Sequence, residues 1–475
     1  MTGGRDEPFV EWRRGRAPGL RVKLRIAGEG KGLSDYFRWT AETFAMDKVF
    51  EKPEALHGIR ILDMTNVILG PVVGDYLGEY GAEVFRVELP GRGDPTMRVV
   101  TPFGIFWKNA CPGFFPQNRN KYFITIDVRK PEGVDLFKQL ARRCDVVVEN
   151  FIAGTMDEWG IGYRQLREVK PDIIMLSLNG FGQWGPFSIG RPSWDLAAQA
   201  ASGHAAITGF PGRPPGKAGL YLGDYTGGLL GAIAVLAALH YRERTGKGQY
   251  IDYAQAEGLI RTMDWTWVYQ GLTGRERGRY GNRDISFCPS DIFRCQDGFV
   301  AIAAADDEEF RGLCLAMGRP DLIEDERFRT AEARLKEEHA LELLQIIRDW
   351  AATKTREEID ALGELYRFGS APVMGFKDQN YDPHLRARGM VWEIDDPVYG
   401  RVVEVGPVVK MSETPGRLRW SARPVGFDNE YVFVKMLGLR PSELKALEEK
   451  GVIGKWAPLL GSMPPDGWRG EGTIF

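Results

Sequence analysis

A single carboxylate stands among glycines in the stretch GLYLGDYTGG, residues 219–228. This residue, Asp224, comes directly before the apolar run Leu229 to Leu239, which is typical of a buried helix. One interpretation is a helix N-cap, since an aspartate at that place satisfies free backbone N–H groups. The other is chemical: a helix N-terminus keeps a carboxylate ionised, glycines leave room for a bulky acyl group, and an ionised carboxylate can act as a covalent nucleophile.

The histidines and cysteines show no pattern typical of a metal site or of a disulfide framework. The five histidines show no HExxH or other ligand spacing, and the five cysteines are scattered without a CxxC pair. We therefore predict no metal site and no disulfide framework. A Cys–His nucleophile stays open, since such pairs meet only in space, although no cysteine lies in a recognisable catalytic motif.

The elements that must position Asp224 are predicted to form a doubly wound α/β sheet. Strands rich in β-branched residues alternate with helical stretches, which favours parallel strands. In such a sheet, ligands bind beyond the carboxyl ends of the strands. The expected strands are residues 58–64, 82–88, 145–150 and 172–178, and the expected helices are residues 72–80 and 131–144.

The turn after the first predicted strand and the net charge of the chain disfavour several classes of ligand. The turn reads Gly70-Pro71-Val72-Val73-Gly74 where a dinucleotide site needs GxGxxG. The net charge of −3, from 62 basic and 65 acidic residues, gives no bulk attraction to nucleic acid or to an anionic membrane. The longest apolar run, residues 227–239, is too short to cross a bilayer. We expect a soluble, cytoplasmic protein that binds neither nucleic acid nor membrane.

The chain is long enough for two domains, because 475 residues exceed one typical domain. Composition changes after residue 255, where short strands and then charged helical sequence follow the α/β unit. We expect an N-terminal extension (1–57), the first part of a large domain (58–255), a linker (256–279), a small domain (280–352), a second linker (353–373) and a C-terminal part that rejoins the large domain (374–475).

Seven segments resemble, in order and spacing, those of family III CoA-transferases, nearest to the carnitine and bile-acid, or CaiB/BaiF, branch. The resemblance extends from about Gly58 to Gly451. The segments are GIRILDMTNVILGPVVGDYLGEYGAEVFRVELPGRGDPTMR, NRNKYFITIDVRKPEG, DVVVENFIAG, LNGFGQWGP, RPSWDLAAQAASG, ITGFPGRPPGKAGLYLGDYTGG and RTGKGQYIDYAQAE.

The resemblance implies an activity and a fold. In enzymes similar to this chain, the aspartate that matches Asp224 attacks an acyl-CoA, and CoA passes to a free acid through an aspartyl-CoA thioester. The implied fold is a Rossmann-like large domain with a smaller α+β domain, in a dimer of two interlocked rings. Coenzyme A and acyl-CoA are then substrates, and no tightly bound cofactor is expected. The identity of the two acids stays open.

The three phosphoryl groups of CoA require local cations. Basic residues gather in NRNK and DVRK, and we expect Lys121 and Arg129 to bind phosphates. The alternative for these residues is an ordinary solvated surface. By resemblance, the residues that contact the nucleotide end of CoA are Ile126, Arg129, Asn150 and Phe151.

A second enzymatic class of the same fold, the α-methylacyl-CoA racemases, moves an α-proton with a His and an Asp. That class would carry histidine before Asp195, where this chain has Trp194, and tryptophan is no base near neutral pH. Asp195 is then a candidate helper carboxylate, with capping of the helix 196–201 as its structural alternative. A third possibility is a non-catalytic subunit of a heteromeric transferase, against which the presence of Asp224 argues.

Overall fold

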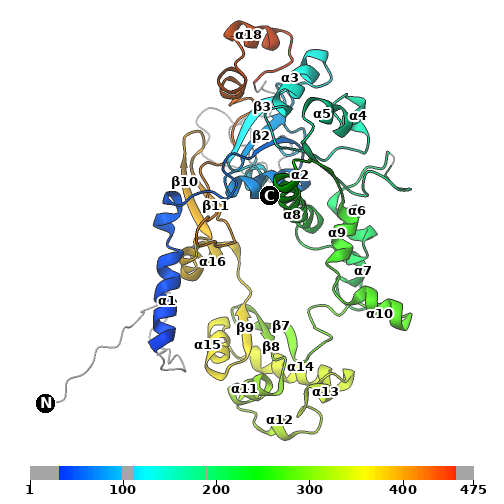
Figure 1. Ribbon diagram of the computed structural model, residues 1–475. Helices are drawn as coiled ribbons and strands as arrows, with labels where there is room; N and C mark the ends of the chain where they lie inside the picture. The colour runs from blue at the N-terminus through cyan, green and yellow to red at the C-terminus, as the bar shows by residue number, and fades with distance from the viewer. Residues whose placement is uncertain (1–30, 99–110, 189, 456–475) are drawn as a thin grey trace, which may run out of the picture.

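The computed structural model describes residues 31–98, 111–188 and 190–455 (Figure 1). Six parallel strands form the central sheet in the order β3-β2-β1-β4-β5-β6. This is the strand order of a Rossmann sheet, and it confirms the predicted α/β class. The strands are β1 (Arg60–Met64), β2 (Glu83–Glu88), β3 (Lys121–Thr125), β4 (Val146–Glu149), β5 (Ile174–Asn179) and β6 (Tyr250–Ala254).

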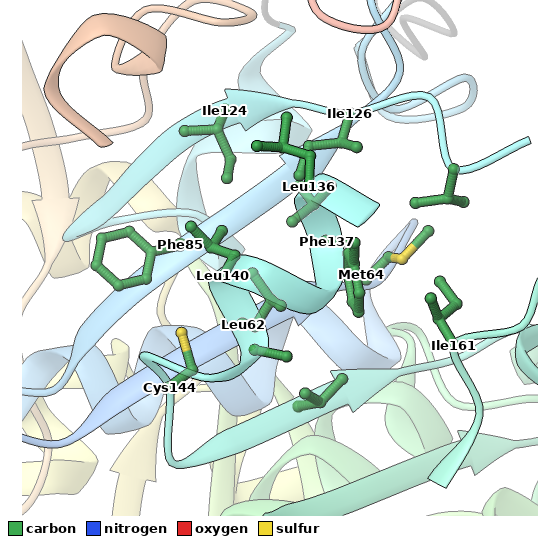
Figure 2. Packing of buried hydrophobic residues seen from close by; sticks show 14 of the residues in the cluster. Leu62, Met64, Phe85, Ile124, Ile126, Leu136, Phe137, Leu140, Cys144 and Ile161 are labelled. Carbon is green, nitrogen blue, oxygen red and sulfur yellow. The ribbon is translucent and has the colours of Figure 1, made fainter. Parts of the chain in front are cut away.

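Helices cover both faces of the sheet, which explains why its inner strands read as nearly continuous apolar runs. On one face, Leu136, Phe137 and Leu140 of α3 (Pro131–Ala141) pack with Phe85 and Leu62 of the strands, as Figure 2 shows. The helices α4 (Thr155–Glu158) and α5 (Tyr163–Val169) lie beside α3.

On the other face, α8 (Leu222–Thr245) crosses α2 (Leu69–Glu79) at close range. A β-carbon on Gly227 would lie 2.3 Å from Leu69 Cδ1, and one on Gly228 would lie 2.3 Å from Val72 Cγ1. These two glycines therefore allow helix contact, whereas the sequence predicts that glycines near Asp224 leave room for an acyl group.

In the described part of the chain, α8 alone has the length and hydropathy of a membrane span, with 24 residues and a mean hydropathy of 1.5. It is longer than the predicted apolar run, residues 227–239, because the helix begins at Leu222 and ends at Thr245. Its Val235 and Ala238 are fully buried in the core beneath the sheet. This packing is that of a core helix.

The small domain is built on an antiparallel sheet with the order β7-β8-β9. Residues 353–373, predicted as a linker, instead form α15 and β9, and Ile359 and Phe368 are buried in the small-domain core. That prediction is wrong because β9 pairs with β8, a contact distant in sequence. The elements are β7 (Ser290–Cys295), β8 (Gly298–Ala303), α11 (Asp307–Met317), α12 (Asp321–Glu324), α13 (Ala331–Arg334), α14 (Glu337–Ala351), α15 (Arg356–Tyr366) and β9 (Gly369–Pro372).

Two connections join the small domain to the large one (Figure 1). The outgoing connection contains α9 (Gln255–Arg261) and α10 (Thr266–Thr273), and the returning one contains α16 (Phe376–Tyr381) and α17 (Pro383–Ala387). A hairpin of β10 (Val391–Asp396) and β11 (Gly400–Val405) follows.

The C-terminal part covers the outer edge of β3. The backbone N–H of Phe123 donates to Asp428 Oδ2 at 2.8 Å, and that of Thr125 donates to Asn429 Oδ1 at 2.9 Å. The helices η3 (Tyr431–Met436) and α18 (Pro441–Glu449) then pack beside α3. These bonds satisfy backbone groups that an edge strand would otherwise leave free.

The described residues of the N-terminal extension form α1 (Lys31–Thr43) and η1 (Met46–Glu51), and η2 (Pro112–Gln117) precedes β3. The ammonium of Lys52 donates to the carbonyl of Ser412 at 2.8 Å, so the extension is tied to the C-terminal part.

Candidate active site

A pocket of about 180 Å³ lies at the carboxyl ends of β1 and β4, which are neighbours in the sheet. The strand order reverses between these two strands, so the connections that follow them lead in opposite directions. Asn66 and Val67 follow β1, Asn150 follows β4, and Asn179 ends β5. The carboxyl ends of parallel strands at this reversal of strand order form the ligand site of a Rossmann sheet. Asp195 and Asp224 line the same pocket from the helices α6 (Asp195–Ala201) and α8.

Asp224 is not a helix cap. It is the third residue of α8, whose N-cap position is Tyr221, and no side chain of that N-cap residue bonds the helix. The side chain of Asp224 accepts a hydrogen bond of 2.6 Å from Gln255 Nε2, at the start of α9. The structure therefore does not support the N-cap interpretation, and the carboxylate lines the pocket.

Burial, with a smaller contribution from the nearby charge of Asp195, raises the pKa of Asp224 to about 7, and the hydrogen bond from Gln255 opposes the shift. The residue is 8% exposed. Its position in the first turn of α8 was expected to keep the carboxylate ionised, but desolvation outweighs that effect. Asp224 thus changes its charge near neutral pH.

Asp195 supports the start of α8 from the neighbouring helix. Its Oδ1 accepts the backbone N–H of Gly223 at 2.7 Å, and its Oδ2 accepts from Gln199 Nε2 at 2.6 Å. The Oε1 atom of Gln199 in turn accepts the backbone N–H of Ala218 at 2.8 Å. Asp195 therefore bonds the free N–H at the start of α8 and fixes the loop before it.

Asn150 and Phe151 both line the pocket. The Asn150 amide holds the β1–α2 loop, because Oδ1 accepts the Asn66 N–H at 2.7 Å and Nδ2 donates to the Asn66 carbonyl at 2.8 Å. The Phe151 ring packs edge-on to Trp159 with 5.0 Å between centroids. These two residues form the wall opposite α6 and α8.

Lys121, predicted to bind a phosphate, lies inside the protein. Its ammonium is fully buried and donates to Asp63 Oδ2 at 2.9 Å and to the Pro71 carbonyl at 2.7 Å. Burial lowers its pKa to about 8. An ammonium enclosed in this way is inaccessible to a phosphate, so we assign Lys121 a structural role.

Ile126 and Arg129 do not line the pocket. The Ile126 side chain is buried in the core between the sheet and α3 (Figure 2), which leaves only its backbone for a ligand. The Arg129 side chain is 62% exposed and pairs with Asp127 at 2.7 Å. This placement fits a residue at the outer end of a long ligand.

The β1–α2 loop has a strained residue that no sequence signal marks. Val67 has φ of 65°, a region that β-branched residues rarely adopt. Its N–H donates to Asp94 Oδ2 at 2.8 Å, and the same oxygen accepts from Arg86 Nη2 at 2.9 Å. The buried Arg86–Asp94 pair therefore holds Val67 in the wall of the pocket.

Sequence reasoning also missed Gln255 and Arg191, which line the pocket. Gln255 directly follows β6, so a polar residue after a parallel strand was the available signal. Arg191 lies in the segment RPSWDLAAQAASG, in which the family resemblance points to Trp194 and Asp195 and gives no role to the arginine.

Comparison with known proteins shows the family of this chain. The family model for CoA-transferase family III matches residues 56–429. The chain is 36% identical to succinyl-CoA:D-citramalate CoA-transferase of Chloroflexus aurantiacus, over 84% of this chain and 98% of that one. It is 39% identical to succinyl-CoA:mesaconate CoA-transferase of Haloarcula hispanica, over 76% of this chain and 91% of that one.

Structural similarity gives the same result. The crystal structure of a CaiB/BaiF family protein from Brucella suis superposes with a TM-score of 0.72 and 30% identity, covering 81% of this chain and all of that one. The fold, the family match and the curated relatives agree over most of the chain. The chain belongs to CoA-transferase family III, and it is a CoA-transferase.

Proposed function

We propose that this protein moves CoA from a dicarboxylic acyl-CoA to a free dicarboxylic acid, with Asp224 as the covalent carrier. The observation that carries the proposal is the buried Asp224 carboxylate in the pocket at the β1–β4 reversal, held by Gln255 and by the helix start that Asp195 fixes. The relatives support the substrate class, because their names join succinyl-CoA to D-citramalate, mesaconate or glutarate.

In the first half of the reaction, an Asp224 oxygen attacks the thioester carbonyl, the C–S bond breaks, and CoA leaves as a thiolate. The product is a mixed anhydride of Asp224 and the donor acid. The thiolate then attacks the Asp224 carbonyl carbon, which forms an aspartyl-CoA thioester and releases the donor acid as a carboxylate. Both partners of the exchange are carboxylates, so the sequence of steps needs no ATP.

The second half reverses these steps with the acceptor. Its carboxylate attacks the aspartyl thioester and releases the CoA thiolate, and the thiolate then attacks the acceptor carbonyl of the new anhydride. The products are the acceptor acyl-CoA and free Asp224. The Gln255 amide, which donates to Asp224 in the resting protein, remains within reach of the same oxygen as the aspartyl group changes.

The nucleotide end of CoA is proposed to leave the pocket past Asn150 and Phe151 toward Arg129. Asn150 and Phe151 are pocket residues, and Arg129 has an exposed guanidinium at the amino end of α3. The backbone carbonyl of Ile126 is the part of that residue that a ligand can use, since its side chain is buried and its N–H donates to the Glu88 carbonyl at 3.0 Å.

The isomerase alternative uses a histidine together with an aspartate, and no histidine is among the described residues that line the pocket. Trp194 occupies the place before Asp195, and His204, at the start of α7 (His204–Ile207), is not among the lining residues.

The subunit alternative has a specific basis, since two relatives at 37% and 36% identity are named beta and alpha subunits of a succinyl-CoA:L-malate transferase. We propose that this chain is active without a second kind of subunit, because it has a complete candidate nucleophile site. We also propose that it acts in the cytoplasm, where its five free cysteines would stay reduced.

The test is a screen of the purified protein against pairs of acyl-CoA donors and free acids, with new CoA esters identified by mass spectrometry. We expect transfer from succinyl-CoA to at least one C4 or C5 dicarboxylic acid. No transfer with any pair, together with exchange of the α-proton of an acyl-CoA into deuterated solvent, would favour the isomerase.

A further inference from the structure

One exposed cation lines the pocket that holds Asp224, and among the described residues it has no hydrogen-bond or ion-pair partner. Of the residues that line it in the described chain, Arg191 is the one with a basic side chain, whereas Asp195 and Asp224 are acidic. Within residues 31–98, 111–188 and 190–455, the Arg191 guanidinium forms no hydrogen bond or ion pair to the protein. It lies instead 4.6 Å from the ring centroid of Phe181 and 4.5 Å from that of Phe187.

This contact with two aromatic rings prepares the guanidinium for an anion. The rings attract the cation and reduce its freedom, and they use its faces rather than its N–H edge. That edge presents parallel donors whose spacing matches the two oxygens of a carboxylate. Phe181 and Phe187 themselves pack edge-on, with 6.0 Å between centroids, so the platform is formed before a ligand arrives.

The charge balance of the pocket makes such a cation necessary for a dicarboxylic acid. One carboxyl group of the substrate reacts at Asp224, and the other is an anion brought into a pocket with two aspartates. The neighbouring cations cannot neutralise it, because Arg86 and Lys121 are fully buried in ion pairs with Asp63. Among the described residues, Arg191 is the basic group that lines the pocket.

We propose that Arg191 binds the carboxylate at the unreactive end of the donor and acceptor acids and thereby sets the preference for dicarboxylic over monocarboxylic substrates. This inference rests on the proposed function of the pocket. A phosphate of CoA is the competing anion, and it differs in one respect: it is present in every acyl-CoA, whereas the distal carboxylate is present only in dicarboxylic ones.

The experiment compares two identity exchanges, which need no knowledge of the natural acceptor. One is the transfer of CoA from succinyl-CoA to ¹³C-labelled succinate, and the other is from butyryl-CoA to ¹³C-labelled butyrate. Butyrate keeps the four-carbon chain and replaces the distal carboxylate by a methyl group. The variants are Arg191→Met and Arg191→Lys, with Arg164→Met as control, because the Arg164 side chain is 85% exposed on α5, which does not line the pocket.

We expect Arg191→Met to lower kcat/KM for the succinyl exchange by roughly 10- to 100-fold, the range for losing a hydrogen-bonded charged partner. The butyryl exchange and inhibition by free CoA should change less than about threefold in the same variant. Arg191→Lys should recover part of the succinyl activity, and the control should match the wild type.

Two results would overturn the inference while leaving the proposed function in place. Equal losses in both exchanges, with weaker inhibition by CoA, would assign Arg191 to a phosphate. An unchanged ratio of succinyl to butyryl exchange would remove Arg191 from specificity. A wild-type protein that catalyses neither exchange would instead contradict the proposed function itself.

Discussion

Asp224 has two properties that a nucleophilic carboxylate needs: it is already desolvated in the folded protein, and its pKa lies close to neutral pH. Most of its desolvation has already occurred in the folded protein, where burial and Asp195 together raise the pKa to about 7. A carboxylate with a raised pKa is a stronger base and so a better nucleophile than one in water, provided that it is ionised. The hydrogen bond from Gln255 limits the rise and keeps part of the population ionised near neutral pH.

The first prediction concerns the pH dependence of acylation. The rate of the first half-reaction should fall as the pH decreases through about 7, because protonated Asp224 is not nucleophilic. Gln255→Leu should move the midpoint upward, since it removes the group that lowers the pKa. The measurement is single-turnover release of CoA between pH 5 and 9. A profile flat across neutrality would contradict the assignment.

The same shift has a consequence for stability. Because the folded pKa lies above the ordinary value of 3.8, the folded state binds this proton more tightly than the unfolded state. The contribution to stability is present at low pH and is lost as the pH rises through about 7. Asp224→Asn lacks this titration. The free energy of unfolding of the variant, minus that of the wild type, should therefore increase by up to about 2 kcal/mol when the pH is raised from 5.5 to 8.5. Urea unfolding at the two pH values measures this difference.

At the scale of elements, the contact of α8 with α2 places Asp224 over the carboxyl ends of the strands. The contact depends on glycine because Val72 of α2 fills the space beside Gly228. Replacing Gly228 by alanine improves helix propensity by about 1 kcal/mol but forces an atom to within 2.3 Å of Val72.

The second prediction is that Gly228→Ala lowers the free energy of unfolding by about 1–3 kcal/mol, as overpacking does. The matched control is Gly271→Ala in α10, where no atom lies within 4 Å of the added β-carbon, so stability should stay level or rise. Denaturant unfolding of both variants checks this. Equal effects at the two positions would show that packing against α2 is not the cause.

The third prediction separates two basic residues that begin and follow β3. Lys121→Met leaves Asp63 without one of its buried partners and should lower stability by about 3–5 kcal/mol, with an unchanged KM for acyl-CoA. Arg129→Ala should leave stability nearly unchanged and raise that KM, more at low salt. Thermal unfolding and initial rates at two salt concentrations measure both effects. The reverse pattern would return Lys121 to the CoA site.

At the scale of the whole molecule, two connections join the two domains (Figure 1), and both carry large apolar side chains that are exposed. Leu272 of α10 is 82% exposed and Phe376 of α16 is 90% exposed, one on each connection. Large side chains that are almost wholly exposed would be buried if a second chain covered the two connections. They support the dimer of interlocked rings that the resemblance implies.

The fourth prediction is therefore a dimer, with a mass about twice the 53.3 kDa of one chain, in light scattering after size-exclusion chromatography. Leu272→Glu and Phe376→Glu should weaken it, whereas Leu341→Glu, on α14 of the small domain, should not. A monomer at micromolar concentration that retains full activity would argue against the interlocked arrangement.

The large-scale arrangement was more predictable than the details of the site. β-branched runs marked β1, β2, β4 and β5, and their alternation with helices was enough to predict a parallel sheet. The pairing of β9 with β8 left no such signal, because the segment is short, polar and distant in sequence from its partner. Likewise, Lys121 and Arg129 both lie in short basic motifs, and the sequence does not distinguish them. The position of Lys121 in β3 directs its side chain into the protein, which only the structure shows.

The central claim is that Asp224 carries the reacting group, and trapping tests it most directly. Wild-type protein is incubated with succinyl-CoA and hydroxylamine, and the peptide containing YLGDYTGG is analysed by mass spectrometry. The account predicts a hydroxamate at Asp224, formed as CoA is released, and no such product in a folded, inactive Asp224→Asn protein. A modification at Asp195 instead, or near-normal CoA transfer by Asp224→Asn, would contradict it.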